Sequence, residues 1–312
     1  DRFMMEEQFG WRVDKFSPDS IKILDTEDLH FLRNYRADTK LDKASIKNSE
    51  LAKREIASIY RCDLTLIISE EEMNLLTTEF DIPNYLLLYL PFLMDSKTEK
   101  NLLPTFEERQ HFISIGNFKH KPNVDAVNYL KKEIWPLIRI GLPEAELHIY
   151  GAYPTQNILQ FHNPKEKFLI KGWAENAENI VKNARVSLAA LRFGAGLKGK
   201  LAEAMKCGTP NITTLIGTEG MSGTHPWSGY VAESALEFAK AAVSLYLDKE
   251  TWLVFQQNGF ALIENRFNKA TFHAVLTNRL ADLASNLQEY RNSNFIGSML
   301  SYHSMKSTQH LS

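Results

Sequence analysis

Short apolar segments alternate with longer segments of helical periodicity along most of the chain. The apolar segments predict strands at residues 21–24, 64–69, 85–90, 112–116, 147–151, 168–172, 186–191 and 212–214. Several are nearly continuous hydrophobic runs, which indicates strands covered on both faces. Helical spacing predicts helices after Pro122 and over residues 235–247, 251–264 and 269–287. This alternation is typical of α/β folds with parallel sheets.

A polar, proline-containing stretch at residues 93–109 predicts a linker between two α/β units. We expect a first domain over residues 1–104, a second over 105–265, and a C-terminal helix and tail over 266–312. Only about three predicted strands precede the linker, whereas a doubly wound domain normally has about five or more, so the first domain is expected to be incomplete. From Asn292 onward the sequence is polar and aperiodic, which predicts a loosely held tail.

Composition narrows the range of functions. The 36 Lys and Arg residues are balanced by 38 Asp and Glu residues, and a net charge of −2 argues against nucleic-acid binding. Cys62 and Cys207 form neither a disulfide framework nor a zinc motif, and no residue spacing predicts a metal site. The longest apolar run, residues 85–94, contains Pro91 and is too short to span a bilayer. We expect a cytoplasmic protein without a transmembrane segment, and peripheral membrane contact stays open.

The residues with the richest chemistry lie between 186 and 220. A predicted strand ends in a turn with Gly194 and Gly196, and Lys198 and Lys200 follow before a helix that contains Glu203. Glycines let the backbone approach phosphate oxygens, a helix N-terminus offers partial positive charge, and lysines add full charges. A carboxylate in the first turns of the helix can accept hydrogen bonds from ribose hydroxyls. The combination predicts a diphosphate site; the alternative is a packed turn with solvated lysines.

The same turn also fits a rival phosphate-binding pattern. Residues 194–200 match G-x-x-x-x-G-K, but Leu201 stands where a Ser or Thr should ligate magnesium. A P-loop usually follows the first strand of its domain, whereas this motif follows about four predicted strands of its own unit. A nucleoside triphosphatase is therefore disfavoured.

Residues 192–221, RFGAGLKGKLAEAMKCGTPNITTLIGTEGM, resemble the donor-site signature of family 4-like retaining glycosyltransferases, G-x-G-x-[RK]-x-K-x-x-E-A-x-x-x-G-x-P. Residues 112–128, FISIGNFKHKPNVDAVN, resemble the first strand and loop of that donor domain, and residues 22–36 and 54–72 resemble the second half of an acceptor domain. The resemblance implies a GT-B fold, in which two doubly wound (Rossmann-like) parallel-sheet domains face each other across a cleft. Here the first domain would be truncated, and residues 266–312 would supply the crossover helix and tail.

The resemblance also implies roles for individual residues. Lys198 and Lys200 would bind the donor diphosphate and neutralise the leaving group, and Glu203 would hold the ribose. The other residues that it places around the nucleotide sugar are Gly116, Asn117, Trp173, Gly194, Gly196, Glu219 and Gly220. For Trp173, ordinary packing remains an alternative to contact with the base.

The sequence departs from many relatives at two places. Ala195 stands where they have the first carboxylate of an E-x7-E pair, so only Glu203 of that pair is present. Relatives often place a histidine after the strand aligned with residues 21–24, where this chain has Glu27, then Asp28, and His30 further on. We expect a site role among these three residues; for the two acids the alternative is helix capping.

The sequence therefore predicts transfer of a sugar from a UDP- or GDP-sugar to a hydroxyl acceptor such as a glycan or lipid-linked saccharide, with retention and without a metal or other cofactor. Two alternatives stay open: a non-catalytic protein that binds nucleotide sugars, and a nucleotide-sugar epimerase of the same fold. A glycosidase would need two opposed carboxylates, and the lysine–glycine turn favours a diphosphate ligand instead.

Overall fold

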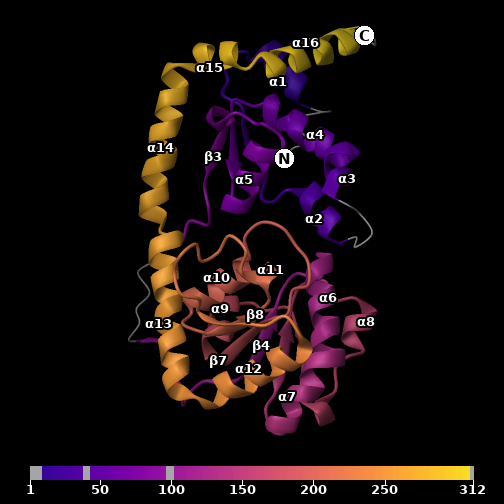
Figure 1. Cartoon of the computed structure of the whole chain (residues 1–312), viewed down its shortest axis with the longest axis vertical. Coiled ribbons are helices and arrows are strands. Elements are labelled where there is room, and N and C mark those ends of the chain that lie inside the picture. Colours follow the sequence, from indigo (N-terminus) through magenta and orange to yellow (C-terminus); the bar gives the residue numbers. More distant parts are fainter. Residues whose placement is uncertain (1–8, 38–42, 96–101, 310–312) are drawn as a thin grey trace. The chain divides into compact units, whose positions relative to one another are not determined.

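The computed structural model describes residues 9–37, 43–95 and 102–309, and these form two compact units (Figure 1). The first unit comprises Asp1–Leu93, Ala195–Leu197 and Lys269–Ser312, and the second comprises Met94–Gly194 and Lys198–Asn268. Both contain parallel sheets with helices, as the alternating pattern predicted. The domain limits inferred from the sequence, at residues 104 and 265, stay predictions.

The first unit contains a three-stranded parallel sheet in the order β1-β2-β3. The strands are β1 (Ile23–Asp25), β2 (Leu64–Ile67) and β3 (Leu87–Tyr89), and β3 follows a short 3-10 turn, η2 (Asn84–Leu86). The helices are α1 (Gly10–Phe16), α2 (His30–Ala37), α3 (Lys43–Asn48), α4 (Glu50–Tyr60), α5 (Glu70–Glu79), α14 (Lys269–Ser285), α15 (Leu287–Ser293) and α16 (Phe295–Gln309). The buried side chains of Leu24, Ile67 and Leu87 pack from the sheet into a hydrophobic core that also contains residues of α2, α4 and α5.

The C-terminal part of the chain is more ordered than its sequence suggested. The prediction of a loose tail from Asn292 is wrong for the described residues, because α16 extends from Phe295 to Gln309 and lies beside α1 (Figure 1). Its contact with α4 uses Gly297, where an added Cβ would lie 2.2 Å from the carbonyl oxygen of Tyr60. Phe295, Met299 and Tyr302 recur at helical spacing, so the sequence carries a signal for this helix that the prediction missed.

The second unit contains a six-stranded sheet in the order β6-β5-β4-β7-β8-β9, with every neighbouring pair parallel. The strands are β4 (Gln110–Ile115), β5 (Leu147–Tyr150), β6 (Phe168–Gly172), β7 (Ala184–Ala189), β8 (Asn211–Thr213) and β9 (Gly229–Val231). In chain order, β5 pairs with β4 and β6 pairs with β5 on one side of β4. The next strand, β7, then pairs with the other side of β4. The strand β9 was not predicted, because it begins at Gly229 directly after a stretch rich in Gly, Ser and Pro, which is typical of a loop.

Helices cover both faces of this sheet. One face holds the larger core, with α6 (Lys121–Tyr129), the π-turn η4 (Leu130–Ile134), α7 (Trp135–Gly141) and α12 (Ala235–Leu247). The other holds a smaller core with α9 (Ala177–Asn183) and α10 (Gly199–Lys206), and α13 (Lys249–Arg266) packs on α10. The remaining elements are α8 (Gln156–Leu159), η5 (Pro164–Glu166) and α11 (Leu215–Thr218). Two covered faces explain the nearly continuous apolar runs of the strands.

A fully buried arginine joins three segments at the amino end of β4. The guanidinium of Arg109 donates from Nη1 to Thr209 Oγ1 at 2.7 Å, from Nη2 to the carbonyl of Cys207 at 3.0 Å, and from Nε to the carbonyl of Pro104 at 3.0 Å. Burial lowers the pKa of Arg109 to about 10. The charged side chain of Arg109 therefore donates hydrogen bonds to several segments inside the second unit. Its removal would leave several buried acceptors without donors.

Candidate functional site

The strand order places the predicted glycines at one edge of the second sheet. Gly116 directly follows β4, Gly172 ends β6, and the turn with Gly194 follows β7. In parallel sheets these carboxyl ends share one edge, and ligands bind there where the strand order reverses. The reversal lies between β4 and β7, so the loops that follow these two strands frame the candidate site.

A lysine from one loop reaches the other loop. Lys200, in the first turn of α10, donates from Nζ to Asn123 Oδ1 at 2.6 Å, and Asn123 Nδ2 donates to the carbonyl of Asn117 at 2.8 Å. A Cβ atom added to Gly116 would lie 2.8 Å from Lys200 Nζ, so glycine at this position lets the ammonium group approach the backbone. These contacts bring together Gly116, Asn117 and Lys200, which the resemblance implied. They also include Asn123, which the resemblance did not name.

A second bridge joins the same two loops. Arg192, which follows β7, donates from Nε to Asp125 Oδ2 at 2.9 Å and from Nη2 to Asp125 Oδ1, and its guanidinium lies 4.8 Å from the centroid of the Tyr129 ring. Asp125 and Asn123 are both in the first turns of α6. The sequence interpretation missed Asn123, Asp125 and Arg192. The available signal was the start of a predicted helix with two short polar side chains separated by one residue, Asn123 and Asp125.

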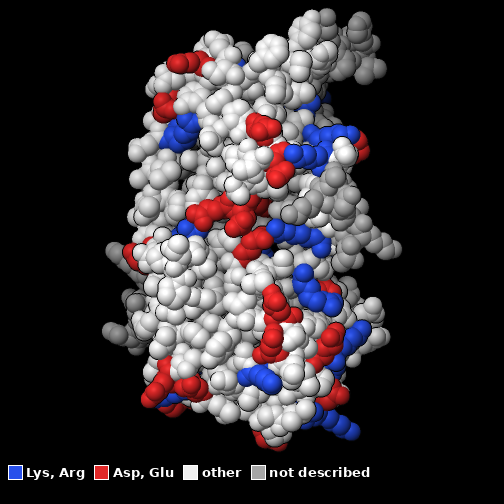
Figure 2. All heavy atoms as spheres, viewed as in Figure 1, with Lys and Arg blue, Asp and Glu red and all other residues white. Residues whose placement is uncertain are grey.

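The lysines create a local, partly desolvated positive charge. Lys198 is 8% exposed. Burial, and then the neighbouring charge of Lys198, lowers the pKa of Lys200 from 10.5 to about 8. The helix α10 begins at Gly199, and its N-cap residue, Lys198, makes no side-chain capping hydrogen bond. Two ammonium groups and an uncapped helix end together favour an anion. On the face shown in Figure 2, acidic and basic side chains are interspersed.

Glu203 lies on α10, which packs against α9. Burial, followed by the nearby charge of Glu178, raises the pKa of Glu203, while Lys206 acts in the opposite direction. Glu178 lies in the first turn of α9 and accepts a hydrogen bond from Lys206 Nζ at 3.3 Å. The start of α9, which carries Glu178, is thus close enough to Glu203 to influence its charge.

Trp173 and the turn after β8 complete the predicted set in this unit. Trp173 directly follows β6 and its side chain is 70% exposed, so it does not pack in the core. Glu219 and Gly220 follow α11 and are partly exposed, and Gly220 adopts φ +72°, which favours glycine. Gly196 also adopts a positive φ, +61°, and its segment Ala195–Leu197 groups with the first unit.

The first-unit candidates follow β1 and lead into α2. Asp28 pairs with Arg33 Nη1 at 2.8 Å and with His30 Nε2 at 3.4 Å, and Glu27 is exposed at φ +57°. The backbone N–H of His30 donates to Glu55 Oε1 at 3.1 Å.

The start of α2 is stabilised from outside this segment. Glu55 also accepts from the N–H of Phe31 at 2.8 Å, and the buried Glu72 accepts from the N–H of Leu29 at 3.0 Å. Two buried carboxylates from α4 and α5 therefore cap α2. Helix capping by Glu27 or Asp28 stays an alternative to a role of these acids in the site.

Two further properties concern metals and membranes. Within residues 9–37, 43–95 and 102–309, no group of three or more His, Cys, Asp or Glu side chains is arranged to hold a metal ion. Across these same ranges, the helices lack the combination of length and apolar character that crossing a bilayer demands.

The two sheets define a parallel α/β fold of the GT-B type, as the sequence predicted. Residues 109–248 match the model of the family described as "Glycosyl transferases group 1", and this match covers most of the second unit. Comparison with the sequences of curated proteins finds no significant match.

Solved structures share the fold at low identity. TarM, known from S. aureus, is 15% identical with a TM-score of 0.68 over 86% of this chain. The pneumococcal O-GlcNAc transferase GtfA, in complex with UDP and GlcNAc, is 16% identical with a TM-score of 0.63 over 89% of this chain. HepE of Anabaena, in complex with UDP and glucose, is 11% identical with a TM-score of 0.63, over 87% of this chain and 74% of HepE. This chain covers 57% of TarM and 55% of GtfA, about half of their length.

Proposed function

We propose that the second unit binds the diphosphate of a nucleotide sugar, and that the chain belongs to a retaining, family 4-like glycosyltransferase that needs no metal ion. The observation that supports this most is the Lys200–Asn123 contact, which sets an ammonium group between the two loops at the reversal of the strand order. A fixed cation there can stabilise the charge of a departing diphosphate without reorganisation, which is the role that a metal ion plays in other enzymes.

The proposed roles follow from the positions. Lys198 and Lys200 bind the diphosphate together with the start of α10, and Gly116 and Asn117 approach it from the loop after β4. Glu203 accepts hydrogen bonds from the ribose. Trp173, whose ring is exposed, contacts the base, and Glu219 and Gly220 complete the site near the sugar. A uridine nucleotide is the first choice, because GtfA and HepE are complexes with UDP.

The first unit is proposed to supply the acceptor side. Residues 1–104 would form the truncated acceptor domain, and residues 266–312 the crossover helix and tail. Among its candidates, Asp28 holds His30 and Arg33 together, so the cluster offers both a carboxylate and an imidazole near the carboxyl end of β1. The acceptor is proposed to be a sugar or lipid-linked hydroxyl group.

The test is a panel of UDP, GDP, ADP and UMP in a thermal-shift assay, followed by incubation with radiolabelled UDP- and GDP-sugars. A diphosphate present at about 100 times its dissociation constant should stabilise the protein by about 2.7 kcal/mol. Label transferred only when an acceptor is added supports the transferase. Conversion of the donor alone indicates an epimerase, binding without turnover indicates a binding protein, and no response to any nucleoside diphosphate contradicts the donor site.

The affinity for UDP should fall as the pH rises above about 8. Lys200 has a pKa lowered to about 8, so the unliganded protein loses this positive charge above that value, whereas the terminal phosphate of UDP, with a pKa of about 6, stays ionised. Binding then requires uptake of a proton, and the association constant should fall by about tenfold per pH unit above pH 8. Calorimetric titration between pH 7 and 9.5 measures this, and Lys200→Met should bind weakly with a flat profile.

Replacement of Glu203 should weaken binding of the ribose rather than of the diphosphate. Glu203→Ala loses a carboxylate acceptor, and a hydrogen bond to a charged group contributes about 1.5–3 kcal/mol, or roughly ten- to a hundredfold in affinity. Wild type should prefer UDP over 2′,3′-dideoxy-UDP by such a factor, and Glu203→Ala should bind both alike. If the variant keeps the preference, Glu203 does not hold the ribose.

A further inference from the structure

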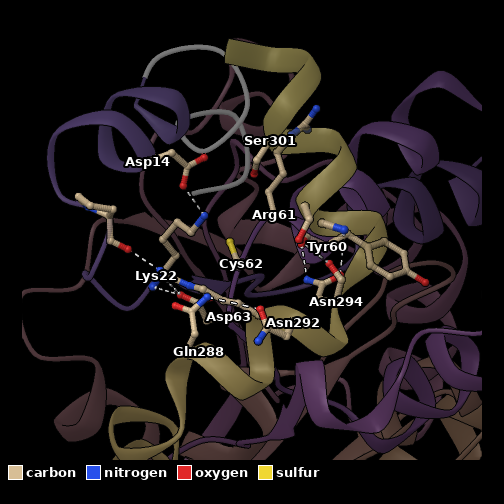
Figure 3. Close-up of a pocket in the computed structure, with 14 residues that line it drawn as sticks. Asp14, Lys22, Tyr60, Arg61, Cys62, Asp63, Gln288, Asn292, Asn294 and Ser301 are labelled. Carbon is tan, nitrogen blue, oxygen red and sulfur yellow. Dashed lines mark hydrogen bonds and ion pairs between the residues drawn. The ribbon is translucent and has the colours of Figure 1, made fainter. Parts of the chain in front are cut away.

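A polar cavity of about 270 Å³ lies in the first unit, at the amino ends of β1 and β2 (Figure 3). Lys22 directly precedes β1, and Cys62 and Asp63 directly precede β2. Glu27, Asp28 and His30 follow the carboxyl end of β1, so the cavity is at the opposite end of this sheet from the proposed acceptor residues. It is a separate feature that the proposed reaction does not use.

The outer wall of the cavity is built by α16. Asn294 donates from Nδ2 to the carbonyl of Tyr60 at 2.8 Å, and its Oδ1 accepts from the N–H of Gly297 at 2.9 Å. The close approach of Gly297 to Tyr60 holds α16 against the end of α4, and Ser301, one turn further, lines the cavity. Figure 3 shows Asn294 and Tyr60 on one side and the Asp14–Lys22 pair on the other.

The two carboxylates in the wall are already paired. Asp14 lies 2.6 Å from Lys22 Nζ. Asp63, whose side chain is 5% exposed, accepts from Arg291 Nε at 2.8 Å, from Arg291 Nη2 at 2.9 Å and from the backbone N–H of Lys22 at 2.8 Å. Lys22 and Arg291 therefore balance Asp14 and Asp63.

Arg61 remains as an uncompensated cation. Among the charged residues that line the cavity, Lys22, Arg61 and Arg291 face Asp14 and Asp63, which is three positive charges against two negative charges. The Nε and Nη1 atoms of Arg61 are buried and have no hydrogen-bond partner within the part of the chain that the structure describes. Buried N–H groups of a guanidinium are costly without acceptors, and ligands with anionic oxygens satisfy them best.

We propose that this cavity binds a small oxyanion ligand, a compound with a phosphate or carboxylate group whose oxygens accept hydrogen bonds from Arg61. Asn294 and Ser301 offer further polar groups from the α16 side. The cavity volume is close to the lower limit of ligand sites, about 300 Å³, and leaves room beyond one oxyanion for the body of a small metabolite.

Calorimetric titration with inorganic phosphate, acetate and glucose 6-phosphate tests the proposal. The titrations use Lys200→Met as the parent protein, so that phosphate binding at the proposed donor site is weakened in every sample. At least one of the three anions should bind saturably, and adding Arg61→Gln should weaken it by at least about tenfold, equivalent to about 1.4 kcal/mol. Tighter binding of glucose 6-phosphate than of phosphate indicates a metabolite; equal affinities indicate a site for the free ion.

The matched control is Lys53→Gln, which removes an exposed cation from α4 and should leave binding unchanged. Arg61→Gln removes an unpaired charge, so its melting temperature should not fall, and wild-type binding of UDP should persist in this single variant. Saturable binding that survives Arg61→Gln, or the absence of binding by all three anions, would overturn the proposal. Either outcome leaves the proposed donor site unaffected, because UDP binding is measured separately.

Discussion

Lys200→Met should lower the turnover of sugar transfer by about two to three orders of magnitude while the melting temperature stays nearly unchanged. Loss of one preorganised group that stabilises developing negative charge costs about 2.7–4 kcal/mol of transition-state stabilisation. The side chain contributes little to folding, because its ammonium group is desolvated and shares a region with Lys198. Methionine keeps most of the length of the side chain and removes the charge together with the hydrogen bond to Asn123.

The measurement is turnover with the donor identified in the radiolabel assay, alongside a thermal melt. Lys240→Met, which replaces an exposed lysine on α12, is the control and should retain full activity. Asn123→Ala keeps the ammonium group but removes its acceptor, so it should lose less turnover than Lys200→Met. Equal turnover in wild type and Lys200→Met, or activity lost only together with the folded state, would favour the alternative of a structural turn with solvated lysines.

Arg109→Leu should lower the free energy of unfolding by about 2–4 kcal/mol. The substitution leaves the partly buried carbonyl of Pro104, the buried carbonyl of Cys207 and the buried hydroxyl of Thr209 without the donors that they now have. Each buried acceptor without a partner costs about 1–3 kcal/mol. Burial of the Arg109 charge is itself unfavourable, so its removal offsets part of the lost stability. The expected loss is therefore smaller than the sum of the three lost hydrogen bonds.

Urea titration of the whole chain measures the change, with the midpoint and slope compared between variants. Arg139→Leu is a matched control in the same unit, because the buried Nε of Arg139 has no hydrogen-bond partner among the described residues, and the expected change is within about 0.5 kcal/mol. A loss below about 1 kcal/mol for Arg109→Leu would mean that water or local rearrangement replaces the guanidinium.

Much of the second unit could be predicted from local patterns. Apolar runs gave the approximate positions of β4 to β8, and the glycine-rich turn before a helix marked the end of a strand. These features depend on neighbours within a few residues, since strand and helix periodicity and the φ preference of glycine are local properties. Lys200 was a candidate for the same reason, because its place at the start of a helix after Gly199 follows from sequence spacing alone.

Contacts between distant residues could not be predicted in this way. Asn123 and Lys200 are 77 positions apart, and Asp125 and Arg192 are 67 apart, so their pairing depends on β4 and β7 being neighbours. A pattern of strands and helices is compatible with several strand orders, and the order alone decides which loops meet. Asn123, Asp125 and Arg192 were therefore missed, although all three lie within segments that the resemblance covered.

The sequence by itself determined the α/β class, the approximate strands and the glycine–lysine turn, because each is encoded by periodicity or backbone preference over a short stretch. The tertiary structure alone decided that Lys200 meets Asn123, that Glu55 and Glu72 cap α2 and that α16 packs through Gly297. It also decided that Nε and Nη1 of Arg61 are buried with no hydrogen-bond partner among the described residues. The physical reason is that hydrogen bonding and desolvation depend on which groups share a volume, and folding brings groups together across any sequence distance.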